Sequence, residues 1–495
     1  MTGPTESLWL ATTQSTARRE PPLPREADVV VLGAGIAGLT TAHLLAKAGR
    51  SVLVLEAGAV AAGVSGHTTA KVTAQHGLIY RDLGPSSAAA YGAAQLAALE
   101  WIADTAARHG IECDFERVDS YVYVTEPDRV DALRAEAEAA AAAGLPASFE
   151  DSGLPVPSAG AVRFRDQAQF HPRRWLLGLA GLVEAAGGVI VEGARATSLS
   201  EGTPVIVRTT RGSVRANEVI VATHYPVFDR GLFFARLDPV RDLVVAGPGP
   251  AVPGTYLDAD THYSVRSASI DGSQYVIVGG EHYRVGGHED VAARFERLSS
   301  WAASHVGLTD VRYRWSAHDL STLDRLPYVG RYYPRAQNLW VATGFGQWGM
   351  TGGTAAGMLL ADLVRGQSNS LASLFDPNRF SLRAAGAFVA NNATVAKYLA
   401  GDHFRALRSS ALSALSPGEA TVTRRGASMV AGYRDDLGAL HVVQARCTHL
   451  GCLVAFNNAE RSWDCPCHGS RFDIDGQVLQ GPAVQPLRKF TEGEK

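Results

Sequence analysis

Two apolar runs separated by a helix-like segment open the chain's first predicted unit. The first run ends at Leu32, an apolar-periodic segment continues to Gly49, and a second run extends from Ser51 to Glu56. Apolar runs of this length are typical of strands buried on both faces, and the segment between them has the period of a helix. The pattern predicts a strand, a glycine turn, a helix and a second strand over residues 28–56.

The turn of this unit has the spacing Gly-x-Gly-x-x-Gly. Its first glycine permits a tight turn, its second lets the backbone approach a pyrophosphate, and its third lets the helix pack closely on the strand. The helix N-terminus offers N–H groups to phosphates, and an acid that ends the second strand can accept the ribose hydroxyls. The pattern predicts a dinucleotide site, with a ligand-free turn as the alternative, and it does not separate FAD from NAD. The residues assigned to this site are Gly33, Gly35, Ile36, Ala37, Gly38 and Glu56.

The last part of the chain has a different pattern. Ser416-Pro-Gly follows a stretch from Asp376 that reads as helices, including an amphipathic run over 394–409. Short strand-like runs punctuated by turns then predict a small β domain. These runs are Ala420–Thr423, Ser428–Tyr433, His441–Gln444, Arg471–Asp473 and Gln477–Leu479.

Composition and charge exclude several classes of protein. With 46% apolar residues, 19% charged residues and a net charge of −3, the 495-residue chain is globular, and its length suggests about three folding units. Basic and acidic residues are balanced without long runs, so neither nucleic acid nor an acidic membrane is an expected partner. Charges interrupt the alanine-rich run 132–145, which predicts a helix but no membrane span. Without a signal-peptide pattern, the expected location is the cytoplasm.

Four of the five cysteines crowd into 21 residues near the end, which indicates a cofactor site rather than a disulfide scaffold. Cys447-Thr-His449 and Cys465-Pro-Cys-His468 are typical of a Rieske [2Fe–2S] centre, in which two thiolates hold one iron and two imidazoles the other. A zinc site made by the same four residues is the alternative.

Five further segments carry a resemblance over about three quarters of the chain. They are Gly63–Lys71, Gln169–Arg173, Asn217–His224, Asp324–Gly330 and Asn338–Gly346. Their order resembles the D-amino-acid oxidase superfamily, which includes glycine and sarcosine oxidases. The resemblance implies an α/β Rossmann-type FAD-binding domain with an inserted α+β substrate domain.

The implied domain boundaries follow from the same resemblance. FAD-binding segments cover about 28–80, 160–225 and 320–370, and substrate-domain segments cover about 81–159 and 226–319. Before them lies an N-terminal extension, 1–27. The oxidoreductase domain as a whole spans 28–375, a helical linker spans 376–416, and an all-β Rieske domain spans 417–495.

The resemblance also assigns residues to the flavin. The glycine-rich segment 344–353 leads into a predicted helix from about Thr354 to Val364. His67 resembles a histidine that sarcosine and dimethylglycine dehydrogenases join covalently to the flavin, while a non-covalent contact or a loop-stabilising hydrogen bond is the other fate. Lys71 either approaches the flavin or is solvated. The assigned residues are His67, Thr68, Lys71, Gly344, Gly346, Trp348, Gly349, Met350 and Thr351.

The tail resembles Rieske domains of the cytochrome bc type, and five expectations follow. Cys452 and Cys467 form a disulfide between the two loops, and Ser470 hydrogen-bonds a cluster sulfide. Phe472 stands where high-potential members have tyrosine, which implies a lower potential because a hydrogen bond to sulfur is lost. Gly481-Pro-Ala covers the cluster, and the imidazole edge is exposed for an external carrier.

Both halves together resemble FAD-dependent oxidoreductases with a C-terminal Rieske domain. The implied activity is dehydrogenation of an amine or amino-acid C–N bond, with electrons passing through the cluster to an external carrier or quinone. A reductase with the opposite electron flow and an oxidase with a structural cluster remain alternatives. A Rieske oxygenase is disfavoured, because no histidine follows His468 to complete a mononuclear iron site. Candidate substrate contacts are Tyr263, Arg266, His282, Arg284 and Trp348.

Overall fold

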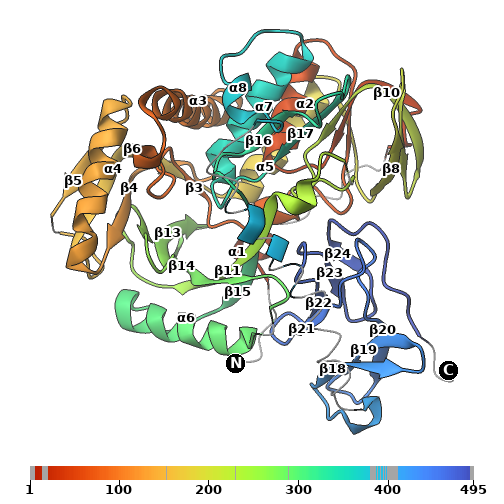
Figure 1. The fold of residues 1–495 in the computed structure, drawn as a ribbon. Coiled ribbons are helices and arrows are strands. Elements are labelled where there is room, and N and C mark those ends of the chain that lie inside the picture. The colour runs from red at the N-terminus through yellow and green to blue at the C-terminus, as the bar shows by residue number, and fades with distance from the viewer. Residues whose placement is uncertain are drawn as a thin grey trace.

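The computed structural model describes residues 6–13, 21–379 except 152, 229 and 288, several residues between 386 and 397, and 411–490. Two large sheets and two small ones form the architecture (Figure 1). The small sheets are built from the C-terminal residues and lie beside the larger body. No helix within these ranges is long and apolar enough to cross a bilayer.

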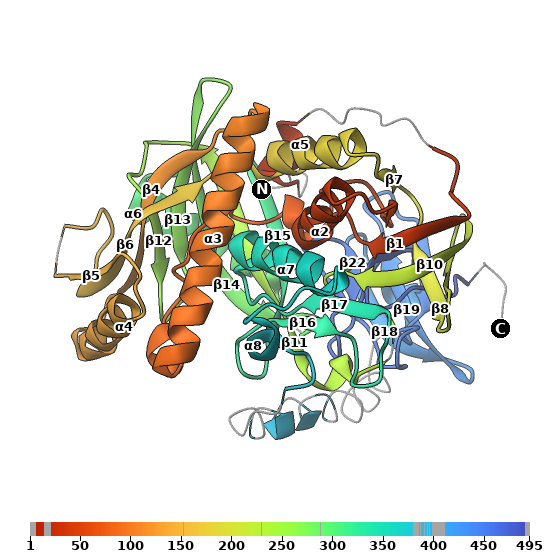
Figure 2. The same ribbon diagram turned by 90° about the horizontal axis from the view of Figure 1, so that it is seen from above.

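An eight-stranded sheet contains the predicted dinucleotide unit. Its central strands pair in parallel and are almost wholly buried, which explains their continuous apolar sequence. Helices α2 (Ile36–Lys47), α5 (Pro172–Ala185) and α7 (Gly349–Val364) pack together beside it (Figure 2). The strand order is β16 (Tyr328–Arg331), β17 (Leu339–Thr343), β10 (Gly212–Val221), β1 (Glu26–Leu32), β2 (Val52–Leu55) and β7 (Val189–Val191), with β8 (Ala196–Ser200) and β9 (Val205–Thr209) attached to β10.

A nine-stranded, mostly antiparallel sheet forms the second layer. Helices α3 (Pro85–His109), α4 (Val130–Ala142) and α6 (Val291–Val306) belong to this part of the chain. The order is β15 (Tyr313–Thr322), β11 (Leu237–Pro248), β14 (Ser273–Arg284), β13 (Ser264–Ile270), β12 (Thr255–Asp258), β4 (Glu116–Val124), β6 (Gly160–Gln169) and β3 (Lys71–Val72), with β5 (Ala147–Glu150) on β6.

The boundary expected at residue 160 differs from the observed pairing. Strand β6 pairs with β4 and β3 in the second sheet, so the chain returns to the first layer only at α5. The reason is long-range pairing, which the apolar pattern of β6 does not reveal. Helix α7 also begins five residues before the predicted Thr354, at Gly349.

The C-terminal domain has a three-stranded and a four-stranded sheet. All five predicted runs are strands, and β21 and β22, which have three residues each, were not predicted. The strands are β18 (Ala420–Arg425), β19 (Ser428–Arg434), β20 (Leu440–Gln444), β21 (Ala455–Asn457), β22 (Ser462–Asp464), β23 (Arg471–Asp473) and β24 (Val478–Gln480). Most of the predicted amphipathic run 394–409 lies outside the described residues.

Candidate functional site

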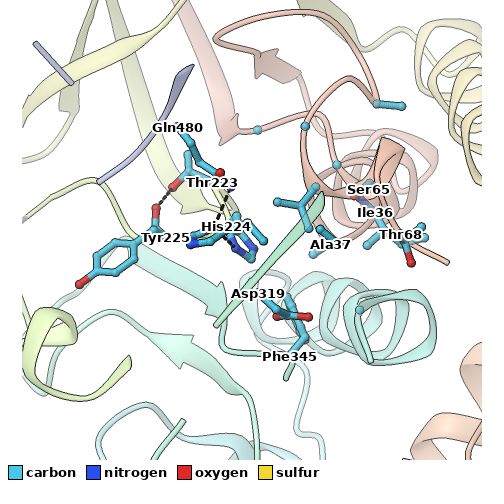
Figure 3. Close-up of a pocket in the computed structure, with 18 of the residues that line it drawn as sticks. Ile36, Ala37, Ser65, Thr68, Thr223, His224, Tyr225, Asp319, Phe345 and Gln480 are labelled. Atoms are coloured by element: carbon cyan, nitrogen blue, oxygen red, sulfur yellow. Dashed lines mark hydrogen bonds between the residues drawn. The ribbon is translucent and has the colours of Figure 1, made fainter. Parts of the chain in front are cut away.

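A long pocket runs from the dinucleotide turn to the second sheet (Figure 3). At the first end, Gly33 has φ +102°, and a Cβ added to it would lie 2.5 Å from the Ala222 carbonyl oxygen. The Glu56 carboxylate accepts hydrogen bonds of 2.8 Å from the backbone N–H groups of Ala34 and Gly58, and burial raises its pKa. This geometry holds an acid beside the turn, as ribose recognition requires.

Of the six residues assigned to the dinucleotide site, five line this pocket. Gly33, Gly35, Ile36, Ala37 and Glu56 face it. Gly38 does not, because its Cα packs against the turn: an added Cβ would lie 2.0 Å from the Gly33 carbonyl oxygen. It therefore fixes the helix against the strand rather than contacting a ligand.

The N-terminus of α7 forms part of the opposite wall. Trp348, Gly349 and Met350 line the pocket, and the Trp348 ring is stacked at 4.8 Å on the ring of His76 behind it. Gly344, Gly346 and Thr351 are not in the lining. They support it instead, since Gly346 N–H donates to the Leu320 carbonyl and Thr351 Oγ1 donates to the Thr73 carbonyl.

The second sheet contributes a polar group that sequence reasoning missed. Asp242 on β11 and Asp319 on β15 lie on one face, because Asp319 is opposite Val240, two residues before Asp242. Burial and the Asp242 charge raise the pKa of Asp319 to about 7. Gln347 Nε2 donates to Asp242 and also lines the pocket. The alternation of polar residues along β11 and β15 was the available signal, but the pairing of these two strands was not predictable from the sequence.

Lys71 faces the same end of the pocket as these carboxylates. Its Nζ donates to Thr69 Oγ1 at 3.1 Å. Burial and the Arg266 charge lower the pKa of Lys71 to about 7. Lys71 is therefore part of the pocket wall, and its approach to the flavin stays a prediction.

The candidate substrate contacts other than Trp348 lie outside the lining. Arg266 is 2% exposed, and its guanidinium donates to the backbone carbonyls of Thr69, Ala70, Phe170 and Ser267. Arg284 pairs with Asp238 at 2.5 Å, and the Tyr263 hydroxyl donates to Glu281. His282 lies behind the pocket, with Nδ1 3.1 Å from Asp242. Backbone carbonyls therefore already accept the hydrogen bonds of Arg266, and Asp238 pairs with Arg284.

His67 also lies outside the lining, although its neighbour Thr68 faces the pocket. The His67 Nδ1 is 2.8 Å from the Gly63 carbonyl oxygen, and its own carbonyl accepts a hydrogen bond from Trp315. This is the loop-stabilising arrangement of the three that the sequence left open.

We expect acid precipitation to release the flavin, because the His67 ring is held by the loop and not directed into the pocket. The flavin absorbance of the supernatant, compared with that of the native protein, measures this. His67→Ala is expected to release no more flavin than the unmodified protein. Yellow colour retained in the pellet, and lost in His67→Ala, would establish the covalent bond instead.

A second site lies in the C-terminal domain, where the four predicted ligands converge. Cys447 and Cys465 are free, buried and hydrogen-bonded to one another through their thiols. The rings of His449 and His468 are 4.9 Å apart. Nδ1 of His468 is buried and has no hydrogen-bond partner among the described residues. Paired thiols beside an orphaned imidazole nitrogen fit a centre with two sulfur and two nitrogen ligands.

Surrounding residues complete the binding loops. Cys452 and Cys467 are joined by a disulfide. The Ser470 hydroxyl contacts the Cys447 sulfur and accepts a hydrogen bond of 3.0 Å from the Ala483 N–H. Phe472 is fully buried and supplies no polar atom.

We expect Cys452→Ser to weaken cluster retention without loss of FAD. The bridge closes a loop with a sequence separation of 15 residues, and a closure of that size stabilises by about 3 kcal/mol. Iron content after mild heating measures retention, and the flavin-to-protein ratio is the internal control. Retention equal to that of the unmodified protein would contradict a stabilising role for the bridge.

The two histidines predicted as ligands face the oxidoreductase domain. His468 is 3% exposed and its ring is 5.9 Å from Phe234, while the ring of His449 is 6.3 Å from Tyr225. The expectation that the imidazole edge is exposed is therefore wrong for His468. Domain packing covers it, which the Rieske motif alone does not encode.

The C-terminal domain also closes the pocket itself. Leu479, Gln480, Gly481 and Val484 line it together with the dinucleotide turn and the acidic pair (Figure 3). Arg195 Nη2 on the pocket wall donates to the Val478 carbonyl at 3.2 Å. The loop that begins at Gly481, which the sequence predicts to cover the cluster, thus also forms part of the wall of the flavin pocket.

Comparison with known proteins gives matches for both parts. Residues 28–363 match the family model "FAD dependent oxidoreductase", and residues 406–491 match "Rieske [2Fe-2S] domain". The chain is 36% identical over 476 residues to the putative Rieske 2Fe-2S iron-sulfur protein YhfW of Bacillus subtilis (strain 168), covering 94% of this chain and 93% of that protein.

Two further relatives match the front part. Gamma-glutamylputrescine oxidoreductase of Escherichia coli (strain K12) is 26% identical, over 69% of this chain and 84% of its own length. Glycine oxidase from Geobacillus kaustophilus superposes with a TM-score of 0.62 at 20% identity, over 72% of this chain and 100% of its own. The latter likeness shows the fold.

Proposed function

Because this chain belongs to the FAD-dependent oxidoreductases and carries a C-terminal Rieske [2Fe–2S] domain, we propose that it is an amine dehydrogenase. Its electrons leave through the cluster to an external carrier. FAD supplies a two-electron acceptor that can release electrons singly, and the cluster carries one electron at a time. The residues named above as lining the first pocket would hold FAD, and Cys447, His449, Cys465 and His468 would hold the cluster.

The wall shared by the two sites is the observation that supports the proposed electron route. Leu479, Gln480, Gly481 and Val484 line the pocket, while the Ala483 N–H donates to Ser470 beside the predicted cluster ligands. The predicted imidazole ligands also face Tyr225 and Phe234 of the oxidoreductase domain. A cluster with only a structural role would not require this orientation.

The charges at the second-sheet end of the pocket support an amine substrate rather than an amino acid. Among the described lining residues, the Lys and Arg side chains are Lys71 and Arg195, and Arg195 lies near Glu56 at the nucleotide end. Within the part of the lining that the structure describes, no arginine at the second-sheet end of the pocket is therefore placed to bind a substrate carboxylate. Asp242 and Asp319 instead offer carboxylates to an ammonium group, and the FAD-dependent relative from Escherichia coli is named for a polyamine derivative.

Two residues have the ionisation that amine oxidation needs. Asp319 binds the ammonium group, and Lys71, with a pKa of about 7, is suited to take up the proton that must leave before oxidation. Gln347 and His282 hold Asp242 in place from its two sides.

We expect Asp319→Asn to weaken amine binding by about 10-fold, because a charge-assisted hydrogen bond contributes about 1.5–3 kcal/mol. Binding should also tighten from about pH 6 to about pH 8 in the unmodified protein, since Asp319 gains negative charge and Lys71 loses positive charge over that range. Asp242, His282 and Arg266 are the other charged groups around them. Perturbation of the oxidised-flavin spectrum by a non-reacting ammonium ion measures this affinity. Unchanged affinity in Asp319→Asn would refute the assignment.

The proposed function is tested by anaerobic mixing with matched pairs of amines and α-amino acids, such as 1,4-diaminobutane and ornithine. We expect the amine to bleach the flavin and the cluster EPR signal of the reduced state to follow. Peroxide formation in air without cluster reduction would favour an oxidase. Cluster reduction by a carrier protein, with no flavin bleaching by any amine, would favour a reductase.

A further inference from the structure

One buried histidine touches both sites. His318 on β15 is 2% exposed, and its Nδ1 lies 2.8 Å from Gln480 Nε2 and 3.1 Å from His224 Nε2. All three residues line the flavin pocket. His224 belongs to the loop after β10, and Gln480 to the Rieske domain, and Figure 3 shows them meeting at one end of the pocket.

The hydrogen bonds determine where this ring carries its proton. The amide nitrogen of Gln480 can only donate, so Nδ1 of His318 accepts, and a neutral ring carries its proton on Nε2. That Nε2 atom is buried and has no hydrogen-bond partner among the described residues. Leaving such a donor unsatisfied costs about 1–3 kcal/mol. Because this cost opposes the observed position of the ring, its other contacts must hold the ring in place.

The Nε2 edge of the ring packs on the cluster-binding loop. A Cβ added to Gly469, the residue after the ligand His468, would lie 2.7 Å from His318 Nε2 and 2.7 Å from Pro239 Cβ. Gly469 has φ +79°, and its N–H donates to the Cys465 carbonyl, so the loop is tightly wound at this contact. The ring thus lies against the residue that follows the predicted ligand His468 and is hydrogen-bonded to the predicted ligand Cys465.

We propose that His318 is a positioning residue that couples the flavin pocket to the cluster. Its ring contacts Gln480 at the pocket through Nδ1 and packs against Gly469 at the ligand loop through Nε2, so a shift at one contact displaces the ring toward the other. Coupling of this kind is reciprocal: FAD binding changes the cluster potential, and the cluster redox state changes FAD affinity by the same factor. This coupling would serve the proposed electron route, on which the inference rests. The coupling itself can be measured without substrate turnover.

The test compares the cluster reduction potential and EPR spectrum of the full chain with FAD bound and with FAD removed. In the unmodified protein we expect the potential to differ between the two forms, and FAD affinity to change by about 5-fold or more on cluster reduction. In His318→Leu both differences should disappear. In His318→Asn the side-chain oxygen can still accept from Gln480 but does not reach Gly469, so docking should persist while the coupling falls.

His305→Asn is the matched control, because His305 is an exposed histidine on α6, outside both sites. It should retain the full potential difference. The proposal is overturned if the unmodified protein shows no difference, or if His318→Leu and His318→Asn both retain it. If His318→Leu fails to bind its cofactors, the potential difference measured in His318→Asn decides whether the proposal stands.

Failure of the proposed function would look different. If no amine bleaches the flavin, the dehydrogenase assignment fails while the potential difference stands. If amines reduce both cofactors but the His318 variants keep the full difference, only the coupling role of His318 fails.

Discussion

Acceptor turnover is expected to collapse in His468→Ala while flavin bleaching by the amine stays close to that of the unmodified protein. His468 is a predicted imidazole ligand of the cluster, and its Nδ1 has no hydrogen-bond partner among the described residues. Even changes next to metal ligands cost about 10- to 100-fold, so loss of a ligand should exceed about 100-fold in turnover with a one-electron acceptor. The end of the pocket that we propose binds the amine lies on the second sheet, away from His468, so this change leaves it unaltered.

The matched control is His441→Gln. His441 lies in the same domain, pairs with Asp435 and Asp475, and is not a ligand. Stopped-flow flavin reduction and steady-state acceptor turnover, measured on the same preparations, separate the two half-reactions. Full acceptor turnover in cluster-free His468→Ala would remove the Rieske domain from the electron path.

FAD binding is expected to be lost in Gly33→Ala. The residue has φ +102°, and the new Cβ would meet the Ala222 carbonyl oxygen at 2.5 Å. Overpacking of this kind costs about 1–3 kcal/mol, and left-handed backbone adds about 1–2 kcal/mol for a residue with a side chain. The strain falls on the turn that contacts the dinucleotide, so FAD affinity should fall by about 30-fold or more, since about 1.4 kcal/mol is tenfold.

The control variant Gly49→Ala separates the backbone strain from the steric clash of the added Cβ. Gly49 has φ +84°, but an added Cβ would meet nothing within 4 Å. This variant should therefore lose about 1 kcal/mol of unfolding free energy and keep its FAD. The flavin-to-protein ratio after gel filtration and the thermal midpoint of each variant test the pair. Equal FAD retention by both variants would show that the clash at Gly33 is unimportant.

The Rieske loops show how much local sequence can reveal. Cys447, His449, Cys465 and His468 lie in two short loops, so the spacing along the chain already brings each pair of ligands together. The same holds for Gly33 and Glu56, because adjacent parallel strands joined by one helix place the turn beside the end of the second strand. Short-range geometry thus determined both cofactor sites.

Contacts between distant segments were decided only by the tertiary structure. Asp242 and Asp319 come together through strand register, and a register shift of one residue would place one of them on the other face. Arg266 and Arg284 have the chemistry of a carboxylate clamp, yet the backbone carbonyls around Arg266 and Asp238 beside Arg284 occupy them.

Domain packing decided the rest. The Rieske motif predicts its ligands but not what covers them, because the covering residues Tyr225 and Phe234 belong to another domain. In the same way, nothing in the local sequence of His318 indicates that Gln480 and Gly469 meet its ring. The sequence alone predicted the dinucleotide turn and the four cluster residues, since these residues are close along the chain or on adjacent strands. How the sites face one another depends on long-range packing, which no local pattern encodes.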